Sequence, residues 1–487
     1  MSDATSAESA ARIARVPREV RHVHLIGVAG TAMAALAGML AERGLRVTGS
    51  DNQLYEPTAS LLKRMRVEVR AGFGPHNLAP PPDLVVVGNV IPRANPEAQA
   101  LLNSVIPYLS MPEALWHFFL SARRVLMVAG THGKTTSTAI MAHVLNSAGR
   151  DPSMLVGGVA RDFASNYRLG AGGDFVIEGD EYDTAFFDKG PKFLHYRPRG
   201  TILTAVEFDH ADIYRDLEHV KSSFRALAAQ MAPEGVLVVS ADSSAALEVT
   251  EGSRARRITF GLDAGEFRAA AITVDAGGAR FSIERGGGAV AEGLRLPIGG
   301  RMNVANALGV AVLLGEFGLG AGEIARGLES FRGVVRRQDL LGEARGVAVV
   351  DDFAHHPTAI RATLAAIAER FAGRRILAAF EPRSNTARRN VFQAEFAAAF
   401  DRAARVYLAP VYFKDNDPIP EGGRLSVEEL AAAIGRRGPA AFACASTDDI
   451  LARILADAYA GDVALIMSNG PFDNLKERLL SALKTSE

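Results

Sequence analysis

Hydrophobic and polar positions alternate along this chain in a way that predicts strands and helices in turn. Short apolar runs that suit buried strands are followed by stretches of helical period, which is typical of parallel sheets covered by helices. Residues 22–27 and 46–51 are predicted as strands around a helix over 31–43, which Gly44 ends, and 84–90 as a further strand. The predicted fold class is therefore α/β.

A second strand-and-helix unit begins at residue 124, with a predicted strand over 125–129, a glycine-bearing turn and a helix to about residue 147. Residues 256–300 differ, because alternating polar and apolar positions with two glycine-rich turns predict antiparallel strands. The first rhythm returns after residue 336, with predicted strands at 347–350, 375–380, 406–409 and 463–467. Boundaries near 121 and 335 follow, which predicts domains at 22–121, 122–335 and 336–487.

Composition and charge exclude several classes of partner. Over 487 residues, 54 basic side chains balance 55 acidic ones, so no long-range field indicates nucleic acid or an anionic membrane surface. Residues 25–40 are the most apolar segment, but they are too few and too rich in glycine for a membrane span. Residues 1–21 lack the apolar centre of a secretory signal and are expected to form a flexible tail. The single cysteine, Cys444, permits no internal disulfide and favours the reducing cytoplasm.

One glycine-rich turn carries the strongest chemical signal. It stands between a predicted strand and a predicted helix and reads Gly130, Thr131, His132, Gly133, Lys134, Thr135 and Thr136. Backbone N–H groups at such a helix start bind phosphate, the lysine neutralises charge, and the Thr135 hydroxyl is placed to ligate Mg²⁺. The strict P-loop pattern would have a further glycine where Val128 stands, so only the shorter form is matched. The turn predicts nucleotide binding.

Two acidic clusters follow predicted strands. One occupies residues 178–183, and the other occupies residues 207–212 and includes His210. Ligands of open α/β sheets bind at the carboxyl ends of strands, so these groups could hold divalent cations near the phosphates. A solvated acidic loop is the alternative for each cluster alone. Two clusters behind a phosphate loop favour a metal site, with Glu178 and His210 as ligands.

A second glycine turn lies in the first predicted domain. Gly27 and Gly30 follow the first strand, and Asp51 closes the second, where a dinucleotide-binding domain has its ribose-binding acid. Ala29 and Ala32 replace the other glycines of that pattern, which argues against an NAD-dependent oxidoreductase. A related nucleotide pocket and a tight turn with a packing glycine both stay open.

The remaining polar motifs carry weight only in combination, and the combination resembles the Mur ligase family. These enzymes form amide bonds with ATP in bacterial peptidoglycan synthesis and recycling. The resemblance runs from residue 22 to residue 480 and keeps the order of the family's motifs. It rests on the phosphate turn, Glu178, the Asp209, His210 and Asp212 group, Asn303 and Asn306, the Arg336 and Arg337 pair, and residues 351–357.

The resemblance implies an architecture and an activity. The expected architecture is an N-terminal Rossmann-like domain, a central P-loop ATPase-like domain and a C-terminal Rossmann-like domain. The spacing of Gly27, Gly30 and Met33 is similar to that of members that use UDP-N-acetylmuramate directly. One group of these adds L-alanine, and another adds the recycled tripeptide L-alanyl-γ-D-glutamyl-meso-diaminopimelate through an acyl phosphate. Residues 181–189, 192–196 and 380–386 resemble the tripeptide-adding members.

Two alternatives to the tripeptide ligase stay open. The nearest is the L-alanine ligase, because only the acceptor separates the two activities. A more distant one is a P-loop NTPase of regulatory role, which would hydrolyse ATP without an acceptor. The sequence does not indicate an oligomeric state.

The resemblance also implies roles for individual residues. Lys134 with the other loop residues would bind the ATP phosphates, one Mg²⁺ would be bound by Thr135 and Glu178, and a second by His210. Lys134, Glu178 and His210 are the expected catalytic residues. The rest of the ATP site is expected at Asn303, Asn306, Arg337, Asp352 and His355, and the UDP pocket at Gly27, Gly30, Thr31 and Asp51.

The acceptor site and one departure from the family complete these expectations. Position and chemistry suggest Arg383, Ser384, Asn385 and Arg388 as peptide-binding residues. Phe224 stands where several family members carry a carbamylated lysine, so no carbamyl-lysine is expected.

Overall fold

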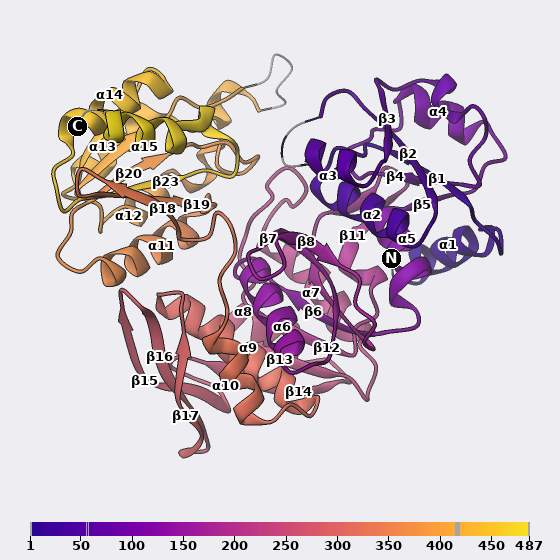
Figure 1. Cartoon of the computed structure of the whole chain (residues 1–487), viewed down its shortest axis with the longest axis horizontal. Helices are drawn as coiled ribbons and strands as arrows, with labels where there is room; N and C mark the ends of the chain where they lie inside the picture. Colours follow the sequence, from indigo (N-terminus) through magenta and orange to yellow (C-terminus); the bar gives the residue numbers. More distant parts are fainter. Residues whose placement is uncertain (1, 55, 57, 414–418, 486–487) are drawn as a thin grey trace. The chain divides into compact units, whose positions relative to one another are not determined.

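The computed structural model describes residues 2–54, 56, 58–413 and 419–485. The chain divides into two compact units (Figure 1). The first unit comprises Met1–Val206, Glu218–Thr259 and Val312–Leu319, and the second comprises Glu207–Leu217, Phe260–Ala311 and Gly320–Glu487. The domain boundaries near residues 121 and 335 stay predictions.

A parallel five-stranded sheet begins the first unit, with strand order β3-β2-β1-β4-β5. Its strands are β1 (His22–Ile26), β2 (Arg46–Asp51), β3 (Glu68–Ala71), β4 (Leu84–Val87) and β5 (Tyr108–Ser110). Its helices are α2 (Thr31–Glu42), α3 (Thr58–Arg64), α4 (Pro96–Leu102) and α5 (Met111–Leu115). The central strands β1 and β4 are buried on both faces, as expected for a parallel sheet that helices cover on both sides. This doubly wound pattern confirms the α/β prediction.

The N-terminal segment is not a tail, so that expectation is wrong. Residues Ser2–Ala14 form helix α1, and the Arg12 guanidinium in its last turn donates to Glu113 of α5 at 2.8 and 3.0 Å. The same guanidinium lies 4.8 Å from the centre of the Phe187 ring. A buried carboxylate partner 101 residues away holds the helix in place, and no local pattern in residues 1–21 reveals that contact.

The second sheet of this unit is built around the phosphate turn. Its strands run in the order β14-β13-β12-β6-β9-β7-β8, with β8 antiparallel to β7. They are β6 (Arg124–Ala129), β7 (Ser153–Ala160), β8 (Ser165–Arg168), β9 (Asp174–Gly179), β12 (Gly200–Leu203), β13 (Val236–Ser240) and β14 (Arg256–Gly261), whose last two residues belong to the second unit. The helices are α6 (Lys134–Ser147), α7 (Leu217–Gln230) and α8 (Ser244–Val249).

A small hairpin links the two sheets of the first unit. Strands β10 (Asp183–Ala185) and β11 (Asp188–Pro191) pair in antiparallel fashion. The turn residues Phe186 and Phe187 pack against the apolar core of the first sheet, and the Phe187 ring meets Tyr108 edge-on with ring centres 5.1 Å apart. Aromatic contacts of this kind anchor the hairpin to β5.

The second unit begins with the antiparallel strands expected over 256–300. They are β15 (Phe267–Asp275), β16 (Gly278–Arg285) and β17 (Gly288–Leu296), followed by α9 (Arg301–Glu316), whose last residues belong to the first unit, and α10 (Ala321–Glu329). The antiparallel prediction is therefore confirmed for β15–β17, but it is wrong for the start of the range, because β14 pairs in parallel with β15.

A six-stranded sheet follows, in the order β18-β19-β23-β20-β21-β22, with only β18 antiparallel to its neighbour. Its strands are β18 (Asp339–Ala344), β19 (Val347–Asp352), β20 (Ile376–Phe380), β21 (Arg405–Leu408), β22 (Ala440–Ala443) and β23 (Val463–Met467). Its helices are α11 (Pro357–Arg370), α12 (Gln393–Ala399), α13 (Val427–Gly435), α14 (Thr447–Asp457) and α15 (Leu475–Thr485). Two apolar clusters, one on each face, bury this sheet.

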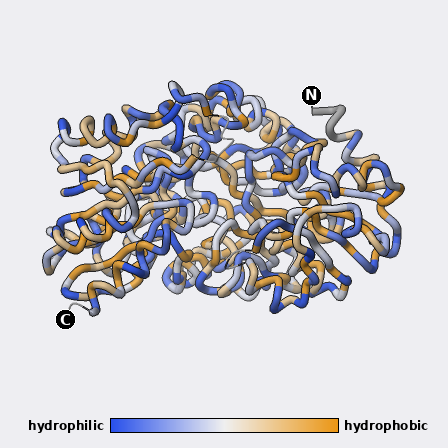
Figure 2. The backbone as a smooth tube through the Cα atoms, turned by 90° about the horizontal axis from the view of Figure 1, so that it is seen from above, coloured by the Kyte–Doolittle hydropathy of each residue, from blue (hydrophilic) through white to orange (hydrophobic). Residues whose placement is uncertain are grey.

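Hydrophobic residues occur in short stretches between hydrophilic ones along the backbone (Figure 2). Uninterrupted apolar runs form buried strands such as β4, β20 and β23. Among the described residues, no helix combines the length and the apolar character needed to cross a bilayer.

Candidate functional site

The phosphate turn joins the carboxyl end of β6 to the first turn of α6, as predicted. Gly133 precedes the helix with a φ of 81°, and Gly130 has a φ of 124°, both in a region that favours glycine. A Cβ on Gly130 would lie 2.3 Å from Thr204 Oγ1 and 2.8 Å from the Ala205 carbonyl oxygen. The turn is held closely to the end of β12, since the Thr131 N–H donates to Ala205 at 2.8 Å. Its backbone N–H groups at the start of a 14-residue helix suit an anion.

Lys134 is the first residue of α6, and its ammonium is held by two acceptors. Nζ donates to the Gly130 carbonyl at 2.6 Å and to Glu181 Oε2 at 2.9 Å. Burial alone would lower the pKa of Lys134, but the carboxylates of Glu181, Asp180 and Glu178 raise it above its usual range. The ammonium is therefore charged at neutral pH, as a phosphate-binding lysine must be.

Thr135 and Glu178 lie side by side next to this lysine. The Thr135 hydroxyl donates to Glu178 Oε2 at 3.3 Å, and the Gly157 N–H donates to Glu178 Oε1 at 2.5 Å. Glu178 leaves the end of β9, and Thr135 leaves the first turn of α6. A carboxylate and a hydroxyl oxygen at this position are the hard donors that Mg²⁺ prefers. The two residues therefore fit the predicted metal role.

In the second unit, a short segment brings an acid and three histidines together. Asp209 is buried, and its Oδ1 accepts from the His210 N–H at 2.7 Å. Burial would raise the pKa of Asp209, but the imidazoles of His210, His355 and His356 hold it well below its usual range. Burial lowers the pKa of His355, so that ring is neutral near pH 7. His210 has a φ of 55°, an uncommon backbone state for a residue other than glycine.

Side chains after β19 hold the segment that contains His210. The Thr358 hydroxyl donates to Glu207 at 2.7 Å, and His356 Nε2 lies 3.2 Å from the Phe208 carbonyl oxygen. The Ala211 N–H donates to the Thr386 hydroxyl at 3.1 Å, and the Asn385 amide donates to Asp212 at 2.7 Å. Residues 207–212 are thus fixed by residues near 356 and near 385, two regions that the sequence analysis had assigned to different substrates.

The residues predicted for the rest of the ATP site fall into two groups. Asp352 accepts from the Gln338 and Ala354 N–H groups at 2.8 Å each, and burial raises its pKa. The Arg337 guanidinium lies 4.9 Å from the centre of the Phe353 ring, and the His355 ring meets Phe353 edge-on. Arg337, Asp352 and His355 are therefore neighbours.

Asn303 and Asn306 form the second group, in the first two turns of α9. Both are buried, the Asn303 amide donates to the Gly299 carbonyl at 2.8 Å, and the Asn306 amide donates to Asn303 Oδ1 at 3.3 Å. These bonds secure the start of the helix, which is a structural role compatible with a further binding role.

The four predicted peptide-binding residues lie in one turn after β20. Arg388 is buried and donates to Asn385 Oδ1 at 3.0 Å and to the Tyr412 carbonyl at 3.3 Å. Arg383 lies 5.0 Å from the centre of the Tyr412 ring and donates to Glu381. Ser384 Oγ accepts from the Ala387 N–H. Arg388 therefore shapes the turn from within, whereas Arg383 is one-third exposed.

The first sheet carries a pocket of about 450 Å³ at the carboxyl ends of its strands. It is lined by Asp51, Asn52, Phe73, Val90, Ile91, Pro92, Ala94, Asn95 and Pro96. Asp51 also accepts from the Ala29 N–H at 2.9 Å, which ties the first glycine turn to this edge. Gly27 and Gly30 belong to that turn and Thr31 begins α2, and none of the three is among the lining residues. Of the four residues predicted to bind the UDP group, Asp51 alone lines the 450 Å³ pocket.

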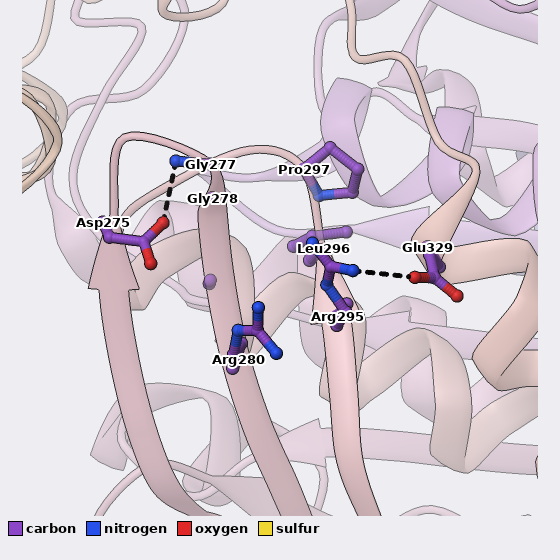
Figure 3. Close-up of a pocket in the computed structure, with 9 residues that line it drawn as sticks. Asp275, Gly277, Gly278, Arg280, Arg295, Leu296, Pro297 and Glu329 are labelled. Carbon is purple, nitrogen blue, oxygen red and sulfur yellow. Dashed lines mark hydrogen bonds and ion pairs between the residues drawn. The ribbon is translucent and has the colours of Figure 1, made fainter.

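Another pocket lies at the end of the β15–β17 strands and contains no predicted site residue. It measures about 350 Å³, and Figure 3 shows Asp275, Arg280, Arg295 and Glu329 around it. Arg295 donates to Glu329 at 3.2 Å, and the Gly277 N–H donates to Asp275 at 2.7 Å. Arg295 and Glu329 are about half exposed, so this is a solvated surface pocket.

Sequence reasoning missed the role of Glu181. Glu181 was recognised only as part of the acidic cluster, although it is the carboxylate that meets Lys134. Its signal was its position three residues after Glu178, just beyond the end of β9. Phe224 of α7 is buried, and its ring lies 5.4 Å from that of Phe193.

Comparisons with known proteins cover most of the chain. Residues 22–123 match the family described as "Mur ligase family, catalytic domain", residues 128–314 the "Mur ligase middle domain", and residues 336–470 the "Mur ligase, glutamate ligase domain". The Escherichia coli (strain K12) UDP-N-acetylmuramate–L-alanyl-gamma-D-glutamyl-meso-2,6-diaminoheptandioate ligase is 38% identical over 448 residues, which are 91% of this chain and 94% of the relative. The chain belongs to the Mur ligase family.

Further relatives within this family include both kinds of UDP-N-acetylmuramate ligase. The UDP-N-acetylmuramate–L-alanine ligase of Rubrobacter xylanophilus is 37% identical over 82% of this chain and 86% of its own length. The crystal structure of a murein peptide ligase from Psychrobacter arcticus covers 95% of this chain and 98% of its own, with 33% identity and a TM-score of 0.70. The three-domain Mur ligase architecture predicted from the sequence is thereby confirmed.

Proposed function

We propose that this protein is an ATP-dependent ligase that joins UDP-N-acetylmuramate to the tripeptide L-alanyl-γ-D-glutamyl-meso-diaminopimelate. The observation that carries the ligase chemistry is the charged Lys134 ammonium in a glycine turn, beside the oxygen donors of Thr135 and Glu178. The tripeptide is favoured over L-alanine because tripeptide ligases are 38% and 36% identical over 91% and 92% of this chain, whereas L-alanine ligases with the same coverage are 32% and 34% identical.

The proposed roles of the three predicted domains follow the family. Residues 22–121 would bind the UDP substrate, 122–335 the ATP phosphates, and 336–487 the rest of ATP and the peptide. Asn303, Asn306, Arg337, Asp352 and His355 keep their proposed role toward ATP. The proposed place of action is the cytoplasm, where ATP is available.

The first chemical step activates a carboxylate that is otherwise inert toward amines. An oxygen of the UDP-N-acetylmuramate carboxylate attacks the γ-phosphorus of ATP, ADP leaves, and an acyl phosphate results. The backbone N–H groups of residues 130–133 and the Lys134 ammonium would hold the phosphates in line and offset their charge. Bound Mg²⁺ would neutralise phosphate charge, with Thr135 and Glu178 as ligands for one ion and His210 for another.

The second step forms the amide bond. The α-amino nitrogen of the tripeptide's alanine attacks the acyl carbon, and inorganic phosphate leaves with the bonding electron pair. The amine must first lose a proton, and since an α-amino pKa is roughly 8, weak general-base assistance is sufficient. Water has to be kept from the acyl phosphate until the amine attacks.

Phosphate release with alternative acceptors tests the proposal. With ATP, Mg²⁺ and UDP-N-acetylmuramate present, we expect release to require the tripeptide and the product mass to equal the UDP-muramyl-tripeptide. Release that requires only L-alanine would assign the other ligase activity, and release without any acceptor would assign an NTPase. Lys134→Met should abolish release, whereas Lys189→Met, which removes a two-thirds exposed lysine of the β10–β11 hairpin, should not.

A further inference from the structure

A fully buried carboxylate lies beneath the pocket of the first sheet. Glu97 stands in the first turn of α4 and has no exposed surface. Its Oε1 accepts from the Ser50 hydroxyl at 2.9 Å, and its Oε2 accepts from the Asn77 amide at 2.7 Å and from the Gly74 N–H at 3.2 Å. His24 Nε2 lies 2.7 Å from Oε1. One side chain thus joins β1, β2, the loop after β3, and α4.

The carboxylate is charged in this setting, and a second layer of bonds supports it. Burial would raise the pKa of Glu97, but the hydrogen bonds from His24, Asn77 and Ser50 bring it below its usual range. His24 Nδ1 lies 2.8 Å from the Thr48 hydroxyl, also fully buried. A buried charge with four partners resists displacement, because moving any partner leaves a desolvated group unpaired.

Two partners of Glu97, Ser50 and Gly74, are next in sequence to residues that line the pocket, and so is Glu97 itself. Ser50 precedes Asp51 and Asn52, which line one side. Gly74 follows Phe73, which lines another side. Asn95 and Pro96, on the third side, directly precede Glu97 itself, and Asn95 Oδ1 accepts from the Glu97 N–H at 2.9 Å.

We propose that Glu97 is a positioning residue for nucleotide binding, which holds the three walls of this pocket at the spacing that a uridine diphosphate group requires. The pocket combines an aromatic ring with acid and amide side chains, which suits a base and a ribose. Glu97 does not line the pocket and acts through the segments that it joins. The inference rests on the proposed use of a UDP-linked substrate and adds the residue that shapes its site.

Two substitutions separate positioning from simple stabilisation. Glu97→Leu keeps the volume but leaves four polar partners without an acceptor. Glu97→Gln can satisfy them, because its amide oxygen can accept from Asn77 and Gly74 while its NH₂ group donates to Ser50 and to His24. The neutral His24 ring then accepts at Nε2 and donates from Nδ1 to Thr48.

A second buried carboxylate in the same unit provides the matched control. Glu113 has no exposed surface and is bonded to Ser110 and Arg12, none of which lines the pocket. Glu113→Leu removes a comparable set of hydrogen bonds from the same unit. The Glu113→Leu substitution should lower the free energy of unfolding without changing the affinity for the nucleotide.

Three quantities are measured: the Kd of UDP by calorimetry without ATP, the KM of UDP-N-acetylmuramate and the KM of ATP. We expect Glu97→Leu to raise the Kd of UDP and the KM of UDP-N-acetylmuramate at least tenfold. The KM of ATP should change less than twofold. Glu97→Gln should stay within threefold of wild type in all three, and Glu113→Leu should leave the Kd of UDP unchanged. Equal effects of the two leucine variants on the Kd of UDP, or an unchanged Kd in Glu97→Leu, would overturn the proposal.

A further variant and the behaviour of the wild-type protein complete the test. If Glu97→Leu does not fold, Ser50→Ala removes one of its bonds, and a two- to fivefold rise in the Kd of UDP is expected, whereas an unchanged Kd refutes the role. Wild-type protein that binds UDP but ligates nothing would contradict the proposed function and leave this inference standing. Wild-type protein that does not bind UDP would overturn this inference.

Discussion

Replacing Gly130 by alanine tests whether the phosphate turn depends on its close approach to β12. The added Cβ would lie 2.3 Å from Thr204 Oγ1, 2.8 Å from the Ala205 oxygen and 2.9 Å from the Ala205 nitrogen. A side chain can rotate away, but the two backbone atoms belong to a segment that the Thr131 N–H also contacts. The turn must therefore move as a whole.

The size of the effect follows from these distances. Restoring an ordinary contact of about 3.4 Å to the Ala205 oxygen requires a shift of roughly 0.6 Å, and a displacement near 1 Å costs on the order of 100-fold in rate. We expect Gly130→Ala to lower kcat/KM for ATP by roughly 10- to 100-fold. The φ of 124° adds a stability loss of about 1–3 kcal/mol.

Gly149 provides the matched control, because its φ is 73° but a Cβ there would meet nothing within 4 Å. Gly149→Ala should therefore lose about 1 kcal/mol of stability and keep full activity. Both variants are assayed by phosphate release and by urea unfolding. Equal activity of the two would refute the steric argument. Restoration of Gly130→Ala by Thr204→Ala would show that only the side chain obstructs, and would refute the part that rests on Ala205.

Three further outcomes are expected. Arg12→Ala leaves Glu113 buried without its cation and should lower the free energy of unfolding, measured with urea, by about 2–4 kcal/mol. Replacing the exposed Arg15 by alanine should not lower it, and equal losses in the two variants would contradict this prediction. Burial raises the pKa of Cys444 to about 11, so a disulfide reagent at pH 8 should label the native protein far more slowly than the unfolded protein. The free energy of unfolding should also fall between about pH 9 and pH 11, because the thiol ionises first in the unfolded chain. Asp209 has a lowered pKa, so its stabilising effect is present above about pH 4 and lost on acidification below it; Asp209→Asn should flatten the stability profile there, and an unchanged slope would count against the assignment.

Much of the fold and part of the candidate site could be predicted because their signals are local. The β6 strand, the turn with Gly130 and Gly133, and the helix from Lys134 follow one another within 25 residues, so period and glycine placement were sufficient. The same holds for the antiparallel strands β15–β17, where alternation and turn residues agree, although β14 at the start of the predicted range pairs in parallel with β15. Thr135 and Glu178 are 43 residues apart, and they were expected to lie close together because ligands of parallel sheets bind at the carboxyl ends of the strands.

Contacts between distant segments could not be predicted in this way. Nothing within residues 1–21 indicates that Arg12 meets a carboxylate 101 residues later, so that segment was misjudged as a tail. The acidic cluster at 178–183 has several carboxylates, and only the way the chain leaves β9 decides that Glu181 meets the lysine while Glu178 meets Thr135. Side chains two or three residues apart after a strand can point to different partners, as those of Glu178 and Glu181 do, and tertiary packing decides which partner each one meets.

The β10–β11 hairpin shows why a feature noted only for its likeness to the family has a physical meaning. Its first flanking residue, Glu181, holds the Lys134 ammonium, and six residues later Phe187 packs on Tyr108 of the first sheet. A segment this short cannot move at one end without straining the other. The phosphate turn and the first sheet therefore contact the same short hairpin, through Glu181 at one end and Phe187 at the other.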